Sequence, residues 1–212
     1  MKIVPGDLTD SRTGLVAVAT EFYRRGWMAG TAGNLSCRDA GGAECFWVTA
    51  SGRAKGALTP EDFLLMDVGS GVVVDPGKPG NKPSAESVIH QTLYQLYPQV
   101  QAVCHVHTVD ACLAAVAPAT SMLPLPALEM LKGLGIWLEQ PEVSLPVFEN
   151  YLDVGRIARN IRQAFEAQTP SVPGFLIRHH GITVWGESLQ QAFHRTEIME
   201  FILSYLARST RP

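Results

Sequence analysis

Helical and strand-forming segments alternate along this sequence without the regular strand–helix–strand repetition of a parallel sheet. Five segments repeat apolar residues at helical spacing, at residues 9–25, 84–97, 109–116, 153–167 and 188–207. Short runs of strand type lie between them, at residues 35–38, 45–49, 64–67, 72–74, 100–107, 175–177 and 182–185. This irregular alternation predicts an α/β fold in which a central, mostly antiparallel sheet is layered between helices.

The size and composition of the chain favour a globular protein with a single domain over residues 1–212. A chain of 212 residues can bury a large core without disulfide bonds. Its content of 46% hydrophobic and 17% charged residues is that of a folded rather than a disordered chain. The formal net charge of −3 argues against binding to nucleic acid or to an anionic membrane. Any anionic ligand must therefore be held by a local arrangement of donors.

The cysteines and the lack of long apolar runs bear on the location of the protein. The four cysteines show no C-x-x-C spacing, and they are Cys37, Cys45, Cys104 and Cys112. We expect reduced thiols, with Cys104 buried in a strand. No apolar run approaches the ~18 residues of a membrane span, and the first residues lack the apolar core of a signal peptide. These features predict a cytoplasmic protein.

Two groups of histidines are candidates for a shared metal site. His105 and His107 stand two positions apart at the end of a predicted strand, so their side chains point to the same face. His179 and His180 lie in the predicted turn between two later strands, from which a third imidazole can reach across the sheet. Three imidazoles with one open position are a common catalytic zinc arrangement. Ordinary surface or core histidines are the alternative, and His90 and His194, within predicted helices, are expected to be of that kind.

Five short motifs occur in the order found in the class II aldolase family, which also includes the adducin head domains. They are Thr31–Asn34, Thr49–Gly52, Pro83–Glu86, His105–His107 and His180–Gly181. The sequence resembles that family from about residue 10 to about residue 205. The resemblance implies the layered α/β fold of the family and one zinc ion per subunit held by His105, His107 and His180. It also implies a homotetramer whose sites lie near subunit boundaries.

Two further stretches resemble the dehydratase branch of this family, and they are Leu128–Gly133 and His180–Gly186. The resemblance implies a zinc-dependent lyase of methionine salvage. Its substrate would be the phosphorylated ketose 5-methylthioribulose 1-phosphate, and its product a 2,3-diketo-5-methylthiopentyl 1-phosphate. His179 departs from that branch, where arginine is frequent, so we treat it as a neighbour of the site or a bystander.

Two glutamates compete for the role of general acid and base. Glu129 matches the acid/base residue of the dehydratase branch, and Glu86 matches the glutamate that the aldolases use beside the metal. Glu86 also fits a structural role, because a carboxylate near a helix start binds free amides. Glu129 could equally be an exposed charge near a proline-rich crossing. We favour Glu129 as the acid/base and Glu86 as a metal ligand in the resting site.

A substrate phosphate would be bound by small donors in three predicted loops. The candidates are Thr31, Gly33, Asn34, Ser51, Gly52 and Ser84. Turn amides and helix starts bind anions without net positive charge. The same residues are also common turn formers, so this assignment stays a hypothesis. Lys55 or Lys132 could add charge, and nothing in the sequence decides between them.

Two other functions remain open on the sequence. A sugar-phosphate aldolase or ribulose-phosphate 4-epimerase would use the same metal with Glu86 as its main acid/base. A non-catalytic, adducin-head-like interaction domain would need no converging imidazoles, so the intact histidine set counts against it.

Overall fold

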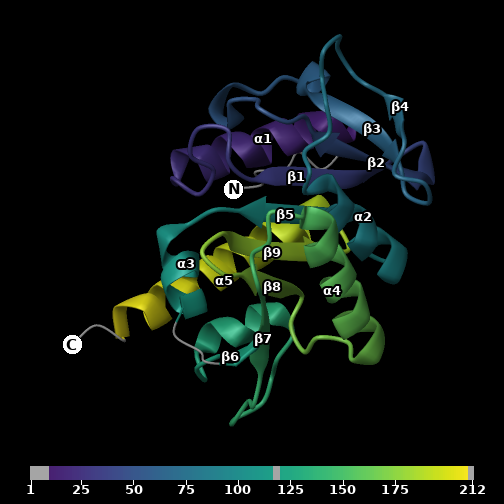
Figure 1. The fold of residues 1–212 in the computed structure, drawn as a ribbon. Helices are drawn as coiled ribbons and strands as arrows, with labels where there is room; N and C mark the ends of the chain where they lie inside the picture. The colour runs from purple at the N-terminus through teal and green to yellow at the C-terminus, as the bar shows by residue number, and fades with distance from the viewer. Residues whose placement is uncertain (1–9, 117–119, 210–212) are drawn as a thin grey trace.

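The computed structural model describes residues 10–116 and 120–209 and contains a nine-stranded sheet flanked by helices (Figure 1). The strands are β1 (Asn34–Asp39), β2 (Gly42–Thr49), β3 (Phe63–Asp67), β4 (Val73–Asp75), β5 (Ala102–Val106), β6 (Met122–Pro124), β7 (Ser144–Phe148), β8 (Gly174–Ile177) and β9 (Gly181–Gly186). The α-helices are α1 (Ser11–Arg24), α2 (Ser87–Leu96), α3 (Val109–Val116), α4 (Val154–Ala167) and α5 (Leu189–Ser209). Short 3-10 helices are η1 (Lys55–Ala57), η2 (Pro60–Asp62) and η3 (Glu129–Leu134).

The strand order is β4-β3-β2-β1-β5-β9-β8-β7-β6, so β5 lies in the middle of the sheet. Every neighbouring pair is antiparallel except β7 and β8, which run parallel. The expected fold, an α/β arrangement with a mostly antiparallel sheet between helices, is confirmed.

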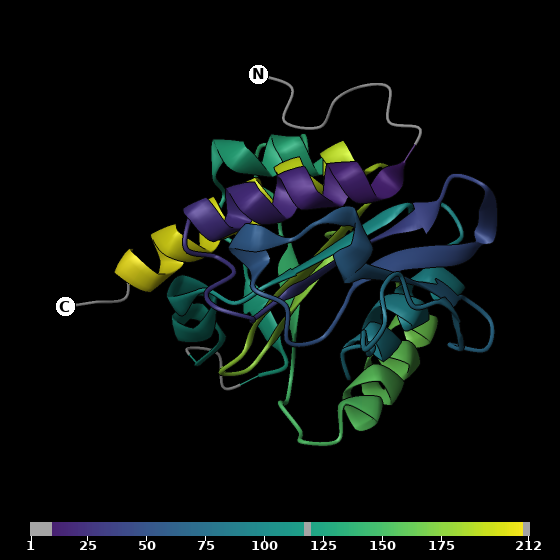
Figure 2. The ribbon, with the colours of Figure 1, turned by 90° about the horizontal axis from the view of Figure 1, so that it is seen from above.

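Helices cover both faces of the sheet, and each face has its own apolar core (Figure 2). On one face α1, α3 and α5 pack around residues such as Phe22 and Phe193, whose rings stack 5.2 Å apart. On the other face α2 and α4 pack around Tyr94 and Phe165. Because side chains alternate along a strand, β5 contributes to both cores.

Two strands of the sheet, β6 and β7, are not indicated by the sequence pattern. β6 and β7 each include a proline, Pro124 and Pro146, and proline removes a backbone donor from a ladder. β6 lies at the sheet edge, where such a loss is tolerated. Short strands containing proline have no clear signal in the sequence, which explains why they were missed.

The start of α2 also differs from the sequence expectation, in which this helical segment begins at residue 84. The helix begins at Ser87, and Glu86 occupies the position just before it instead of lying in the first turn. The Ser84 hydroxyl accepts a hydrogen bond from the Glu86 backbone N–H at 3.2 Å. The Glu86 side chain makes no capping hydrogen bond to α2, and is therefore free to contact other groups.

The four cysteines are free thiols, as expected, and Cys104 is buried in β5. Burial raises the pKa of both the Cys37 and Cys104 thiols to about 12, which keeps them protonated. Within residues 10–116 and 120–209, none of the helices combines the length and apolar character needed to cross a lipid bilayer.

Candidate metal centre

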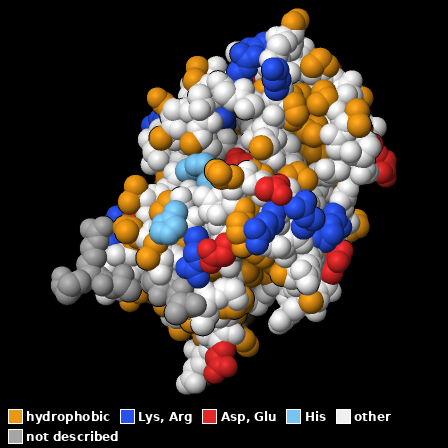
Figure 3. Space-filling model, in the orientation of Figure 1, with side chains coloured by type: hydrophobic (Ala, Val, Ile, Leu, Met, Phe, Trp, Pro, Cys, Tyr) orange, Lys and Arg blue, Asp and Glu red, His pale blue; other side chains and the backbone are white. Residues whose placement is uncertain are grey.

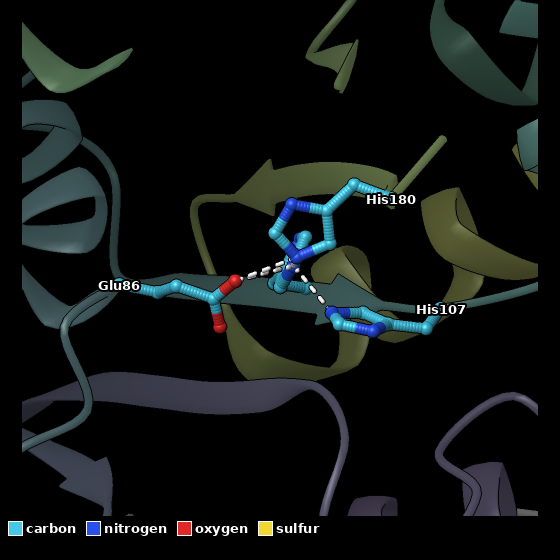
Figure 4. Close-up of side chains that lie close together, drawn as sticks. Glu86, His107 and His180 are labelled. Carbon is cyan, nitrogen blue, oxygen red and sulfur yellow. Dashed lines mark hydrogen bonds and ion pairs between the residues drawn. The ribbon is translucent and has the colours of Figure 1, made fainter. Parts of the chain in front are cut away.

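The site forms at one end of the central strand β5, where three separate segments meet. His105 lies on β5, opposite Asn34 of β1 on one side and Thr183 of β9 on the other. His107 follows the last residue of β5, and His180 lies in the turn that joins β8 to β9. Glu86 reaches the same point from the residue that precedes α2 (Figure 4).

The four side chains direct their donor atoms toward one point. His105 Nε2 lies 2.9 Å from His107 Nε2 and 3.3 Å from His180 Nε2. The Glu86 carboxylate oxygen Oε1 lies 2.7 Å from His180 Nε2 and 3.4 Å from His105 Nε2. One donor atom from each residue lies within 4.8 Å of every other. The predicted convergence of the three histidines is therefore present, with Glu86 as a fourth member.

These spacings fit a tetrahedral metal ion. Four ligand atoms placed tetrahedrally at ~2.0–2.1 Å from zinc would lie about 3.3 Å from one another. Three imidazole nitrogens and one carboxylate oxygen are also ligand types that zinc takes. The residues present thus fit the zinc ion that the sequence predicts.

The ring of His105 is held in one tautomer by the neighbouring strand β9. Its Nδ1 lies 3.1 Å from the carbonyl oxygen of Ile182 and 3.0 Å from the Thr183 hydroxyl. A carbonyl can only accept, so Nδ1 carries the proton and donates it. The lone pair of a neutral His105 is then on Nε2, which points to the donor cluster, and such support is typical of histidine metal ligands.

A close approach of main chains places His180 beside His107. A Cβ atom on Gly181 would collide with the carbonyl oxygen of Val106, so only glycine lets the turn lie this near β5. The preceding residue, His179, has a φ of 53°, a conformation that residues other than glycine seldom adopt. His179 is exposed and does not belong to the donor cluster among the described residues, as expected of a bystander.

Burial and charge in the cluster favour a bound cation. Burial raises the pKa of Glu86, but His105 and His180 outweigh it and hold that pKa far below its usual range, so Glu86 is ionised. Burial, followed by the neighbouring His105 and His180, lowers the pKa of His107 to about 3. His107 is thus a neutral ligand at ordinary pH, as metal binding requires. Beside it, the Nδ1 atom of His180 is buried without a hydrogen-bond partner among the described residues.

A chain of buried hydrogen bonds extends from Glu86 along the interface between β1 and α2. Asn34 donates with its amide nitrogen to Glu86 Oε2, and its side-chain oxygen accepts from His90 Nε2. His90 Nδ1 accepts from the Ser36 hydroxyl at 2.7 Å, and Ser36 lies 2.7 Å from the Tyr94 hydroxyl. Burial lowers the pKa of His90 to about 3, so the ring is neutral and each of its nitrogens has one role.

The candidate phosphate loops gather on the Glu86 side of the cluster. Asn34 contacts Glu86 directly, and Ser51 donates its backbone N–H to the Lys82 carbonyl at 2.9 Å, next to the turn that holds Ser84. Gly33 is buried with a φ of 76°, whereas Thr31, Ser51 and Gly52 are exposed. The three loops are therefore close in space, as their proposed common ligand requires.

Lys55 connects two of these loops from within the protein. Its side chain is only 2% exposed, and its Nζ donates to the carbonyl oxygens of Thr31 at 2.8 Å and Arg53 at 3.1 Å. Burial lowers the pKa of Lys55 to about 8. The sequence left Lys55 and Lys132 as equal candidates, and the structure places only Lys55 beside these loops.

Glu129 lies away from the donor cluster. It begins η3, its side chain is 82% exposed, and it forms an ion pair with Lys132 at 2.8 Å. Among the described residues it is not part of the group formed by Glu86 and the three histidines. Its role as acid/base is therefore still a prediction.

Fold and site together define a metal-dependent member of a known family. Residues 13–206 match the family described as Class II Aldolase and Adducin N-terminal domain, and the chain belongs to this family. The sequence is 50% identical to a methylthioribulose-1-phosphate dehydratase of Microcystis aeruginosa, over 94% of this chain and 96% of the relative. A dehydratase of the same name from Leptospira biflexa is 40% identical over 95% of this chain and 99% of its own length.

A solved structure of related sequence supports the same class. An L-fuculose-1-phosphate aldolase from Thermus thermophilus superposes with a TM-score of 0.70 at 26% identity, over 92% of this chain and 94% of that one. The expected family, its likeness to the dehydratases and zinc as the metal cofactor are confirmed by the matching relatives together with the donor cluster.

Two parts of the site were missed by the sequence reading. His90 was expected to be an ordinary helical histidine, yet it links Asn34 to Ser36 behind Glu86. The available signal was its spacing, because His90 lies four residues after Glu86 and so on the same side of α2. The loop-bridging contacts of Lys55 had no signal in the sequence.

Proposed function

We propose that this protein is a zinc-dependent hydro-lyase that dehydrates 5-methylthioribulose 1-phosphate in methionine salvage. The observation that carries the proposal is the convergence of Glu86, His105, His107 and His180 in a chain half identical to a dehydratase of that substrate. The product is a 2,3-diketo-5-methylthiopentyl 1-phosphate. The reaction removes a proton from C3 and the hydroxyl group from C4, and the resulting enol becomes the diketone.

The four members of the cluster, together with Glu129, each have a role in this reaction. His105, His107 and His180 hold the zinc, which when bound would polarise the C2 ketone and make the neighbouring C3 proton more acidic. Glu86 completes the donor set in the resting site and yields its place to the substrate. Glu129 takes the C3 proton and then returns a proton to the departing C4 hydroxyl, so that water leaves.

The loops on the Glu86 side hold the substrate phosphate. Thr31, Gly33 and Asn34 supply one group of donors, and Ser51, Gly52 and Ser84 supply the other. Lys55 supports this assignment because its ammonium group joins the Thr31 and Arg53 segments. Turn amides of this kind bind phosphate in a protein of net negative charge.

The assembly and location follow from the same proposal. We infer a single domain that forms a cytoplasmic homotetramer, without nucleic-acid or membrane partners. An exposed Glu129 accords with sites near subunit boundaries, because its side chain is open to contact from a neighbouring subunit.

A class II aldolase or a 4-epimerase is the second candidate function. The position of Glu86 favours it, since Glu86 contacts His180 at 2.7 Å whereas Glu129 stands outside the donor group. Such an enzyme would use Glu86 as its acid/base. An aldolase would cleave a carbon–carbon bond of the sugar phosphate, and an epimerase would invert the configuration at C4.

Product analysis separates the candidates. The zinc-loaded protein is supplied in parallel with 5-methylthioribulose 1-phosphate, fuculose 1-phosphate and ribulose 5-phosphate, and products are identified by mass spectrometry and NMR. We expect loss of one water from the first substrate and no carbon–carbon cleavage of the others. Cleavage to a triose phosphate, or epimerisation without water loss, would contradict the dehydratase assignment.

A further inference from the structure

We propose that one face of α3 forms the pocket for the methylthio tail of the substrate and thereby sets its specificity. The inference rests on the proposed function and extends it to residues that neither the zinc cluster nor the phosphate loops include. Four side chains carry it, and they are Val109, Cys112, Leu113 and Val116.

The first observation is a cavity that adjoins the metal cluster. It has a volume of about 360 Å³, and its lining consists of the metal ligands His107 and His180, the four α3 side chains, Thr108 and His179. Substrate bound at the cluster would therefore have open, largely apolar space directly beside it. Figure 3 shows histidine side chains at the surface with hydrophobic side chains next to them.

The second observation is the distribution of apolar residues around α3. Ala111, Ala114 and Ala115 pack into the core of the sheet. The stripe at positions 109, 112, 113 and 116 follows the spacing of a single helix face, and it points away from that core. Val109 is 74% exposed and Val116 is 54% exposed. An apolar stripe outside the core indicates a binding surface, and its place in one cavity with two metal ligands indicates a substrate surface.

The third observation is that the polar phosphate loops and the apolar α3 stripe lie on different sides of the cluster. Glu86 and His107 approach the other ligands from opposite sides (Figure 4). The loops assigned to phosphate are connected to Glu86 through Asn34, whereas α3 follows directly after His107. The substrate has a polar and an apolar end in the same order. Its phosphate is on C1 and its thioether is on C5, with the C2 ketone between them.

The thiol of Cys112 agrees with an apolar role for this pocket. Burial, and then the charge of Glu200, raises its pKa, so Cys112 presents a neutral thiol to the cavity. A neutral thiol and branched aliphatic side chains suit a methyl thioether, and the aliphatic side chains have no polar atom for the hydroxyl group that ribulose 1-phosphate carries at C5. The α3 stripe thus favours the methylthio sugar over ribulose 1-phosphate.

The test changes one side chain of the stripe and compares two ligands. In Leu113→Ser, kcat and KM are measured for 5-methylthioribulose 1-phosphate, and the inhibition constant is measured for ribulose 1-phosphate, which has a hydroxyl in place of the methylthio group. We expect kcat/KM to fall at least about 10-fold, since apolar group recognition contributes roughly 10–200-fold. The ribulose 1-phosphate constant should change less than about 2-fold, with zinc content unchanged.

Two further variants serve as controls. Leu113→Met keeps a flexible apolar side chain and should restore most of the lost kcat/KM. Leu152→Ser makes the same change at a fully exposed leucine outside the pocket and should leave both constants unchanged. Light scattering of each variant records its assembly state.

Several outcomes would overturn the proposal. Equal weakening of both ligands in Leu113→Ser, or a change in its assembly state, would assign the stripe to general substrate binding or to a subunit contact. Full activity of Leu113→Ser would exclude the pocket while leaving the dehydratase function intact. Failure of the unaltered protein to dehydrate 5-methylthioribulose 1-phosphate would overturn the function and, with it, the pocket.

Discussion

The side chains of Asn34 and His90 form a buried hydrogen bond although the two residues stand 56 positions apart in the sequence. The bond joins the start of β1 to α2 directly behind Glu86, because the other end of the Asn34 amide donates to that carboxylate. Since the His90 ring is neutral and also bonded to Ser36, the Asn34 amide has one favoured orientation. Glu86 is thus positioned by Asn34 and, through Asn34, by His90, and neither residue belongs to the group of metal ligands among the described residues.

This relationship predicts that His90 controls zinc affinity. In His90→Leu, Asn34 loses its partner and Glu86 loses its orientation, so zinc affinity should fall about 10–100-fold, as for other residues that support metal ligands. The unsatisfied Asn34 and Ser36 groups should also lower the free energy of unfolding by about 1–3 kcal/mol. Competition with a fluorescent chelator measures the first effect, and urea unfolding measures the second.

Two variants make this prediction specific. His90→Gln carries an amide nitrogen that can replace Nε2 and should recover most of the zinc affinity. Tyr94→Phe removes the far end of the chain of hydrogen bonds and should retain zinc. A folded His90→Leu protein with unaltered zinc affinity would show that Asn34 orients Glu86 unaided.

Removal of one metal ligand should abolish activity without unfolding the protein. In His107→Ala the nine-stranded sheet and both cores are unaltered, because His107 lies just beyond the end of β5. We expect zinc content near zero by atomic emission and turnover below detection, with an unchanged circular dichroism spectrum. Unfolding of this variant at ordinary temperature would assign the zinc a structural role.

The two glutamates should differ in what their loss removes. Glu129→Gln should lower the rate of dehydration by about 10²–10⁴-fold, the usual contribution of an acid/base residue, with zinc retained. Glu86→Gln should lose both activity and zinc, since Glu86 belongs to the donor cluster. Parallel measurements of rate and zinc content distinguish the two roles. An active Glu129→Gln enzyme beside an inactive Glu86→Gln enzyme would instead indicate the aldolase pattern.

Glu200 on α5 should make stability depend on pH. Burial raises its pKa from 4.5 to about 7, and its Oε1 has no hydrogen-bond partner among the described residues. Between these two values the folded protein binds a proton that the unfolded chain has released. The contribution of Glu200 is therefore most favourable below about pH 4.5 and becomes destabilising as pH rises through 7.

The substitution Glu200→Gln should remove this dependence. We expect the variant to exceed the parent protein by up to about 3 kcal/mol in free energy of unfolding at pH 8, with the difference shrinking toward pH 5.5. Urea titrations at several pH values measure it. Glu187→Gln, at an exposed position, is the control and should show no such trend. Parallel pH profiles for Glu200→Gln and the parent protein would show that Glu200 does not hold its proton in the fold.

The sequence predicted those parts of the fold and site that depend on the local pattern of side chains. The amphipathic segments that became α1 and α4, and the H-x-H pair at the end of β5, are set by side-chain periodicity. The third histidine required the resemblance to a family, because spacing alone cannot place His180 beside His107. The pairing of β7 with β8 and the contacts of Lys55 depend on long-range packing, which local pattern does not record.

The position of Glu129 shows the same limit from the other direction. A motif identified it by likeness to related enzymes, whereas in the structure its side chain is exposed and paired with Lys132. Motifs report which residues a family retains, and they carry no information on which subunit or conformation brings them to the substrate. Glu86, in contrast, was assigned to the metal by the same kind of likeness and lies among the metal ligands.

Two glycines press against the end of β5 from different segments of the chain. A Cβ on Gly33 would stand 2.7 Å from the carbonyl oxygen of His105, and one on Gly181 would collide with that of Val106. In a mutational screen, substitutions at these two glycines should therefore abolish function as often as substitutions at the histidines. Substitution at Gly181 would push His180 away from its partners, and substitution at Gly33 would displace His105. Genetic intolerance at this site thus extends to residues that have no side chain with which to do chemistry.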